Sequence, residues 1–228
     1  MKLNRVEKAL MNNPVRAAVQ RLHEARLMER LGGRLDRMRV LEIGCGRGVG
    51  TEIIFRRFGA REVHAFGLDP DMVEKARRRL RGYPPERLRV FVGDAAAVEA
   101  EEGFYDAVVD FGIIHHVPGW RRAVAEVSRV LRPGGLFLFE EVTRQALSRW
   151  FYRTFLKHPP PENWFTAREF VAELERQGIA VGGNVAGWFF GDFVVGAGRC
   201  GAAGQNSQAR PPLPREEKIN DANFRHAV

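Results

Sequence analysis

Glycine residues occupy every second position from 44 to 50, a pattern suited to a loop that binds a nucleotide-like ligand. The apolar run 39–43 precedes them, and a segment with helical spacing, 51–58, follows. Glycine lacks a Cβ and tolerates positive φ, so the main chain can approach a ligand closely. The following helix supplies free N–H groups and a partial positive charge. Val49 stands where the third glycine of a dinucleotide fingerprint would be, and no Gly-Lys pair completes a phosphate loop.

Three acidic residues stand in or directly after strand-like runs near this loop. Glu42 lies just before the glycines, while Asp69 and Asp94 follow the apolar runs 62–68 and 88–92. Asp69 lies 25 residues beyond Gly44, near the spacing at which an acid meets a ribose. Carboxylates accept hydrogen bonds from ribose hydroxyls and from an exocyclic amine. As structural alternatives, Asp69 could serve as a helix cap and Asp94 as a turn former.

Two adjacent histidines, His115 and His116, follow the apolar run 104–112 and are the candidate catalytic residues. Histidine titrates near neutral pH and can remove a proton from an acceptor hydroxyl. We expect His116 in this role, with His115 as the second choice. The alternative is that one or both only pack or hydrogen-bond at the strand edge. Glu140 and Glu141, placed just beyond a fifth strand, could also face the acceptor.

The run Glu42-x-Gly44-x-Gly46-x-Gly48 resembles motif I of the class I S-adenosylmethionine (SAM)-dependent methyltransferases. Three later segments match that family in the correct order: Asp69-Pro70-Asp71-Met72, Gly93-Asp94-Ala95 and the turn Leu131-Arg132-Pro133-Gly134-Gly135. The chain is most similar to the small-molecule group that contains methyltransferase type 11 and the ubiquinone and menaquinone C-methyltransferases.

The resemblance implies SAM as the cofactor and assigns a contact to each acid. Glu42 would lie near the amino-acid end of SAM, Asp69 at the ribose and Asp94 at the adenine amine. The N–H after Asp94 would serve a ring nitrogen. The further cofactor contacts it implies are Gly44, Cys45, Gly46, Gly48, Pro70, Met72, Ala95, Asp110 and Phe111.

The acceptor is expected to be a small molecule, apolar or aromatic. The Asn-Pro-Pro-Tyr or Asp-Pro-Pro-Tyr signature of many base-amine methyltransferases is missing, which counts against nucleic acid. Two alternatives stay open: an RNA or protein methyltransferase, favoured by the formal charge of +8, and a non-catalytic SAM-binding protein.

The fold implied is a single doubly wound, Rossmann-like α/β domain. Its mostly parallel sheet would have seven strands in the order 3-2-1-4-5-7-6, with an antiparallel edge hairpin near 180–186 and 188–196. Helices are expected at 14–31, 51–58, from 70, at 120–130, 143–157 and 166–177, the last with a capping-box pattern.

The domain is expected to span 1–198. Residues 1–35 would form an N-terminal helical lid, and 143–165 a cap inserted over the acceptor pocket. Arginine and lysine recur along 143–157, so this helix could instead lie on a membrane surface. Residues 199–228 are poor in apolar periodicity and are expected to form a disordered or loosely attached tail.

Size and composition set the remaining expectations. A chain of 228 residues suits one α/β domain. Its two cysteines, Cys45 and Cys200, suggest neither a disulfide framework nor a metal site. The charged segment 1–8 does not lead into a signal-peptide core, so the cytoplasm is the expected location. The oligomeric state stays open.

Overall fold

The structure is a computed structural model that describes residues 18, 20–148, 163–186 and 193–201. The expectations for most of 1–19, for 149–162, for the 187–192 part of the edge hairpin and for 202–228 therefore lie outside the described residues. None of the helices in the described ranges combines the length and apolar character that crossing a bilayer requires.

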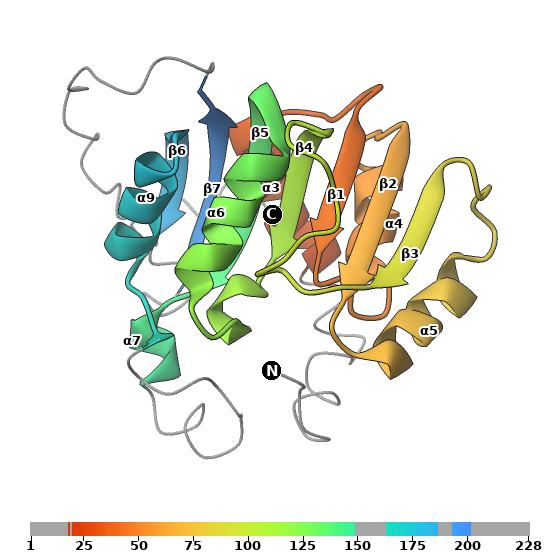
Figure 1. Cartoon of the computed structure of the whole chain (residues 1–228), viewed down its shortest axis with the longest axis horizontal. Coiled ribbons are helices and arrows are strands. Elements are labelled where there is room, and N and C mark those ends of the chain that lie inside the picture. Colours follow the sequence, from red (N-terminus) through yellow and green to blue (C-terminus); the bar gives the residue numbers. More distant parts are fainter. Residues whose placement is uncertain (1–17, 19, 149–162, 187–192, 202–228) are drawn as a thin grey trace.

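Seven strands form one sheet in the order β3-β2-β1-β4-β5-β7-β6, which confirms the expected topology (Figure 1). The strands are β1 (Arg39–Ile43), β2 (Glu62–Gly67), β3 (Leu88–Val92), β4 (Tyr105–Phe111), β5 (Leu131–Val142), β6 (Ile179–Ala186) and β7 (Phe193–Cys200). The first five pair in parallel, and β7 pairs antiparallel with both β5 and β6.

Helices cover both faces of this sheet (Figure 1). They are η1 (Gln20–Glu24), α3 (Ala25–Gly32), α4 (Val49–Arg56), α5 (Pro70–Leu80), η2 (Ile114–His116), α6 (Trp120–Val130), α7 (Arg144–Leu147) and α9 (Ala167–Arg176). One apolar cluster joins α3, α4 and α5 to the sheet, and a second joins α6 and α9 to the opposite face. Covering both faces explains why the parallel strands are near-continuous apolar runs.

Several helix boundaries follow directly from local signals. Pro70 occupies the first turn of α5, and Asp69 caps that helix by accepting the N–H of Asp71. At α9 the expected capping box is present, because Thr166 and Glu169 each accept the other's main-chain N–H. The α6 bounds agree with the predicted 120–130.

The leading helix differs from the expected regular amphipathic helix. Five π-helical residues, Gln20–Glu24, directly precede α3. A π turn changes the residue spacing, so the 3.6-residue periodicity does not continue through it. Leu22 is one of the apolar residues whose roughly helical spacing predicts the apolar face of 14–31, yet it is 60% exposed, whereas Met28 in α3 is fully buried.

The C-terminal strands extend beyond their predicted limits. β7 continues to Cys200, and Arg199 still pairs with Leu136 of β5, so the sheet passes the expected domain end at 198. Glu140 and Glu141 lie within β5 and not beyond it. The added pairing with β7 explains this, because every β5 residue from Leu136 to Val142 has a β7 partner.

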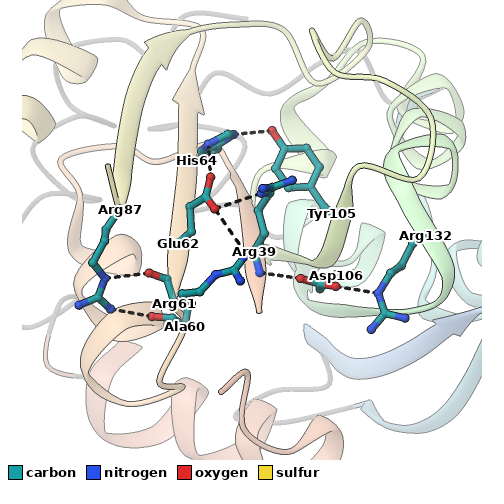
Figure 2. Close-up of polar contacts among 9 residues, drawn as sticks. All are labelled: Arg39, Ala60, Arg61, Glu62, His64, Arg87, Tyr105, Asp106 and Arg132. Carbon is teal, nitrogen blue, oxygen red and sulfur yellow. Dashed lines mark hydrogen bonds and ion pairs between the residues drawn. The ribbon is translucent and has the colours of Figure 1, made fainter. Parts of the chain in front are cut away.

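A polar network ties together the amino ends of the central strands (Figure 2). Glu62 of β2 contacts both Arg39 Nε of β1 and His64 Nε2, each at 3.1 Å. The other nitrogen of His64 lies 3.0 Å from the hydroxyl of Tyr105 in β4, and Asp106 accepts the N–H of Arg39 at 2.7 Å. These contacts lie at the edge opposite the glycine loop, and they hold neighbouring strands in register there.

Candidate active site

The glycine loop between β1 and α4 adopts left-handed main-chain conformations. φ is +77° at Gly44, +50° at Gly46 and +81° at Gly48. A Cβ added at Gly46 would meet no described atom within 4 Å, whereas one at Gly44 would lie 2.3 Å from Ile113 Cγ2. The loop is therefore packed at its start and open at Gly46, where its main chain can meet a ligand.

Glu42 lies beneath this loop and is 2% exposed. The Thr51 hydroxyl, in the first turn of α4, donates a short hydrogen bond to its carboxylate. Gly50 has no Cβ, and this makes space for the carboxylate, since a Cβ there would lie 2.1 Å from Glu42 Oε1. Burial raises the pKa of Glu42 to about 7, with Asp110 adding to the increase and the Thr51 bond opposing it. The Glu42 carboxyl thus connects β1 to the first turn of α4 and supports the loop between them.

Asp69 and Asp94 directly follow β2 and β3, at the sheet edge where the loop lies. Asp69 Oδ1 accepts the N–H of Asp71 at 3.1 Å, and Asp94 Oδ1 accepts the N–H of Ala96 at 2.9 Å. The side chain of Asp94 is exposed. Because β1, β2 and β3 are parallel neighbours, their carboxyl ends bring both acids to the same edge as the glycine loop.

The other expected cofactor residues divide into edge and core positions. Pro70 is exposed at the start of α5. Cys45, Met72, Ala95 and Phe111 are all at most 7% exposed. Their side chains therefore serve packing, and burial also raises the pKa of the Cys45 thiol.

A second group of polar side chains occupies the opposite face of the sheet, beside η2. Glu141 of β5 accepts the N–H groups of Ile114 at 2.6 Å and His115 at 3.1 Å. Its Oε2 also lies 2.6 Å from His115 Nδ1. Asp110 of β4 hydrogen-bonds to the same carboxyl and accepts the N–H of Ile113 at 3.0 Å. All of these side-chain groups are buried.

Burial controls the protonation of this group. Desolvation, followed by repulsion from Glu141, raises the pKa of Asp110 well above its usual range. Desolvation also raises the pKa of Glu141 to about 7, although hydrogen bonds from Asp110, Ile114 and His115 oppose that shift. Because both pKa values are raised, at least one of the two carboxyl groups carries a proton, which makes the hydrogen bond between them. Facing a carboxylate, His115 Nδ1 carries a hydrogen, which leaves Nε2 as its basic nitrogen.

The two candidate histidines differ in their surroundings. His115 is 3% exposed, whereas His116 is half-buried. Their ring centroids lie 4.1 Å apart. Glu140 is also buried, but strand alternation directs it to the face opposite Glu141. The structure thus brings His115, His116 and Glu141 together and separates Glu140 from them.

Sequence reasoning missed two of these relationships. Thr51 was not singled out, although it lies in the first helical turn after the loop and returns to Glu42. The pairing of His115 with Glu141 joins positions 26 residues apart. Alternation along β5 offered a signal for it, because Glu141 shares a face with Phe137 and Phe139.

Comparison with known proteins agrees with this architecture. A model of the methyltransferase domain family matches residues 40–135. A probable S-adenosylmethionine-dependent methyltransferase of Mycolicibacterium smegmatis is 38% identical over 128 residues, covering 56% of this chain and 47% of the relative. A fatty-acid O-methyltransferase of the same organism is 34% identical over 113 residues, covering 49% and 40%. The chain thus spans less than half the length of these curated relatives.

A solved structure extends the agreement in fold beyond the matched region. A SAM-dependent methyltransferase from Aquifex aeolicus aligns with a TM-score of 0.66 and 19% identity, covering 87% of this chain and 100% of that one. The family match and the sheet order together confirm the resemblance drawn from the glycine and acid motifs. The chain therefore has the class I methyltransferase fold, its residues 40–135 match the methyltransferase domain family, and it is similar to a relative named as S-adenosylmethionine-dependent.

Proposed function

We propose that this chain transfers a methyl group from SAM to a small apolar acceptor of the fatty-acid or phenol type. The observation that supports this most directly is that the glycine loop and the histidine turn lie at the ends of neighbouring strands. Glu42 and the glycine loop lie at the carboxyl end of β1. The next two strands, β4 and β5, supply Asp110 and Glu141, which bind the turn that carries the two histidines. A donor bound at the loop would therefore lie beside the histidines.

The residues present fit SAM. The main chain is open at Gly46, and exposed Asp94 offers a carboxylate two strands away. Asp69 directly follows β2 at the same edge, where its carboxylate is the group proposed to meet the ribose. When bound, SAM supplies a methyl group that its sulfonium already makes electrophilic. The task left to the protein is to align the acceptor and exclude water.

The activity of one relative supports the acceptor class. One of the two M. smegmatis relatives is a fatty-acid O-methyltransferase, so its acceptor is a carboxylic acid with an apolar chain. A carboxylic acid is ionised at neutral pH and needs no base, whereas a phenol, with a pKa of about 10, does need one. The need for a base thus separates the two acceptor types.

We propose His116 as the residue that meets the acceptor and His115 as the residue that positions the turn. His115 is 3% exposed and tied to Glu141, while His116 is more accessible and packs against its ring. With a phenol, His116→Ala should lower kcat and remove a pH dependence near neutrality. With a fatty acid, the same variant should retain most of its kcat, because the nucleophile is already ionised.

The first experiment is calorimetric titration with SAM and S-adenosylhomocysteine, using NADH as the control. We expect saturable binding of the two sulfur ligands and none of NADH. Binding of neither sulfur ligand to folded protein would refute the proposal. Transfer of a radiolabelled methyl group to a panel of fatty acids and phenols then tests the acceptor. Binding without transfer to any of them would refute the acceptor class.

A further inference from the structure

A cleft of about 430 Å³ opens between α4, α5 and the loop that leads into β3. We call it the arginine cleft. Its lining includes Glu52, Phe55, Arg56, Arg79, Tyr83 and Arg87. Arg56 and Arg79 belong to the last turns of their helices, and Arg87 directly precedes β3. Most of the lining therefore lies toward the amino ends of the strands, away from the glycine loop.

The charges of the arginine cleft do not balance. Arg79 and Arg21 both contact the same oxygen of Glu52, at 2.9 and 2.6 Å. Arg56 Nε instead donates to the neutral hydroxyl of Tyr83 at 3.3 Å. Among the described residues that line the cleft, Glu52 is the only acid, and it stands against the guanidiniums of Arg56, Arg79 and Arg87. The lining carries a net positive charge of about two, and Arg21 adds to it.

The walls of the cleft are held in place before any ligand arrives. Arg87 donates to the carbonyls of Arg61 at 2.8 Å and Ala60 at 3.1 Å, as Figure 2 shows. Its guanidinium also lies 5.4 Å from the centroid of the Phe55 ring. That ring stacks on Tyr83 with centroids 4.5 Å apart. A preorganised site loses less conformational entropy on binding, which favours a small ligand.

We infer that the arginine cleft is a binding site for a phosphate group, separate from the methyl-transfer site. A phosphate presents several acceptor oxygens and up to two charges, which guanidinium groups match in geometry and sign. The volume lies within the range of small-ligand pockets, about 300 to 1,000 Å³. The aromatic wall of Phe55 and Tyr83 adds apolar surface for the group that the phosphate is attached to.

The test uses inorganic phosphate as the first probe, titrated calorimetrically at low ionic strength with chloride as the control anion. We expect saturable binding that Arg56→Gln and Arg79→Gln each weaken by about ten-fold, the scale of a hydrogen bond to a charged group. Arg78→Gln is the matched control. Arg78 is neighbour to Arg79 on α5, but its side chain is 77% exposed, pairs with Glu74 and does not line the cleft.

A second arm distinguishes a free phosphate from a lipid headgroup. Phosphatidylglycerol vesicles are compared with phosphatidylcholine vesicles in a sedimentation assay, using the same three variants. Stronger binding to phosphatidylglycerol that depends on Arg56 and Arg79 but not on Arg78 would identify a lipid phosphate as the source. Phosphate binding with this variant pattern, but without a vesicle preference, would identify a soluble phosphate ester.

Two results would overturn the inference. One is an equal loss of binding in all three variants, which is the behaviour of diffuse surface charge screened by salt. The other is an absence of saturable binding to either probe by protein with an unaltered circular dichroism spectrum. Arg56→Gln keeps the test valid if Arg79→Gln fails to fold, because Arg56 donates its described hydrogen bond to Tyr83 within the cleft and makes no ion pair that supports the fold elsewhere in the described residues. Neither result depends on methyl transfer.

Discussion

His115 and Glu141 form a buried pair in which Nδ1 lies 2.6 Å from Oε2 and neither side chain is more than 4% exposed. Glu141 also accepts two main-chain N–H groups of the same turn. One carboxylate therefore fixes both the main chain of η2 and the orientation of its first histidine. The turn that presents His116 depends on a residue of β5.

Glu141→Gln should destabilise the protein and reduce turnover together. Glutamine has one acceptor oxygen where Glu141 has two, and its NH₂ group would face N–H donors. The free energy of unfolding should fall by about 1–3 kcal/mol, the cost of unsatisfied buried groups. Urea denaturation measures it, with the exposed Glu86→Gln as the control. An unchanged midpoint would contradict the proposed support of η2.

Glu42 should make stability depend on pH. Its pKa is about 7 in the folded protein against an ordinary 4.5, so the folded state retains a proton that the unfolded state has lost. Stability from this group is full below about pH 4.5 and is lost as pH rises to about 7, by up to roughly 3 kcal/mol.

The measurement compares wild type with Glu42→Gln by urea denaturation at several pH values from 4.5 to 8. Taking the difference between the two proteins cancels the histidines, His23 and His64, whose pKa values are lowered by burial and which titrate in the same window. The wild type should lose more stability across the window than the variant. Parallel curves would show that Glu42 is not buried as described.

Gly46→Ala should weaken SAM binding more than it weakens the fold. Its φ of +50° makes a side chain strained, at about 1 kcal/mol, and the new methyl would project into the open side of the loop. Gly178 has a φ of +81° and equally open surroundings after α9, far from the loop in sequence. Gly178→Ala should therefore cost similar stability and leave SAM affinity intact. Calorimetry with both variants checks this, and equal SAM affinities would contradict it.

Asp69→Asn should separate the two roles of Asp69. Asparagine caps helices as well as aspartate does, so α5 should stay intact, whereas Asp69→Ala should cost about 1 kcal/mol of stability. Both variants lose the carboxylate proposed to meet the ribose. Each should weaken SAM binding by about 1.5–3 kcal/mol in a calorimetric titration. Full affinity in Asp69→Asn would remove the ribose assignment.

The sheet order could be predicted because each motif belongs to a particular strand end. The glycine loop, Asp69 and Asp94 follow β1, β2 and β3, and their order along the chain fixes the order in the sheet once the resemblance is accepted. Helices with strong local signals, such as α6 and the capping box of α9, were predicted well for the same reason.

The contacts within the site could be predicted less well, because they depend on distant partners. Periodicity placed Leu22 on an apolar face, and a π turn moved it into solvent. The motif identified His115 and His116 together, but only the register of β5 shows which one Glu141 holds. Glu52 and Tyr83 line one cleft because α4 packs beside the end of α5, and no local pattern specifies that packing.

The position of β7 has a consequence for how the sheet is completed during synthesis. β7 is the last described strand in the chain, yet it lies between β5 and β6. Until residues 193–200 leave the ribosome, the edge of β5 from Leu136 to Val142 lacks its partner. This edge is rich in leucine and phenylalanine and is an aggregation-prone template while it is open. We therefore expect a nascent chain that stalls before β7 to aggregate more readily than one that stalls after it.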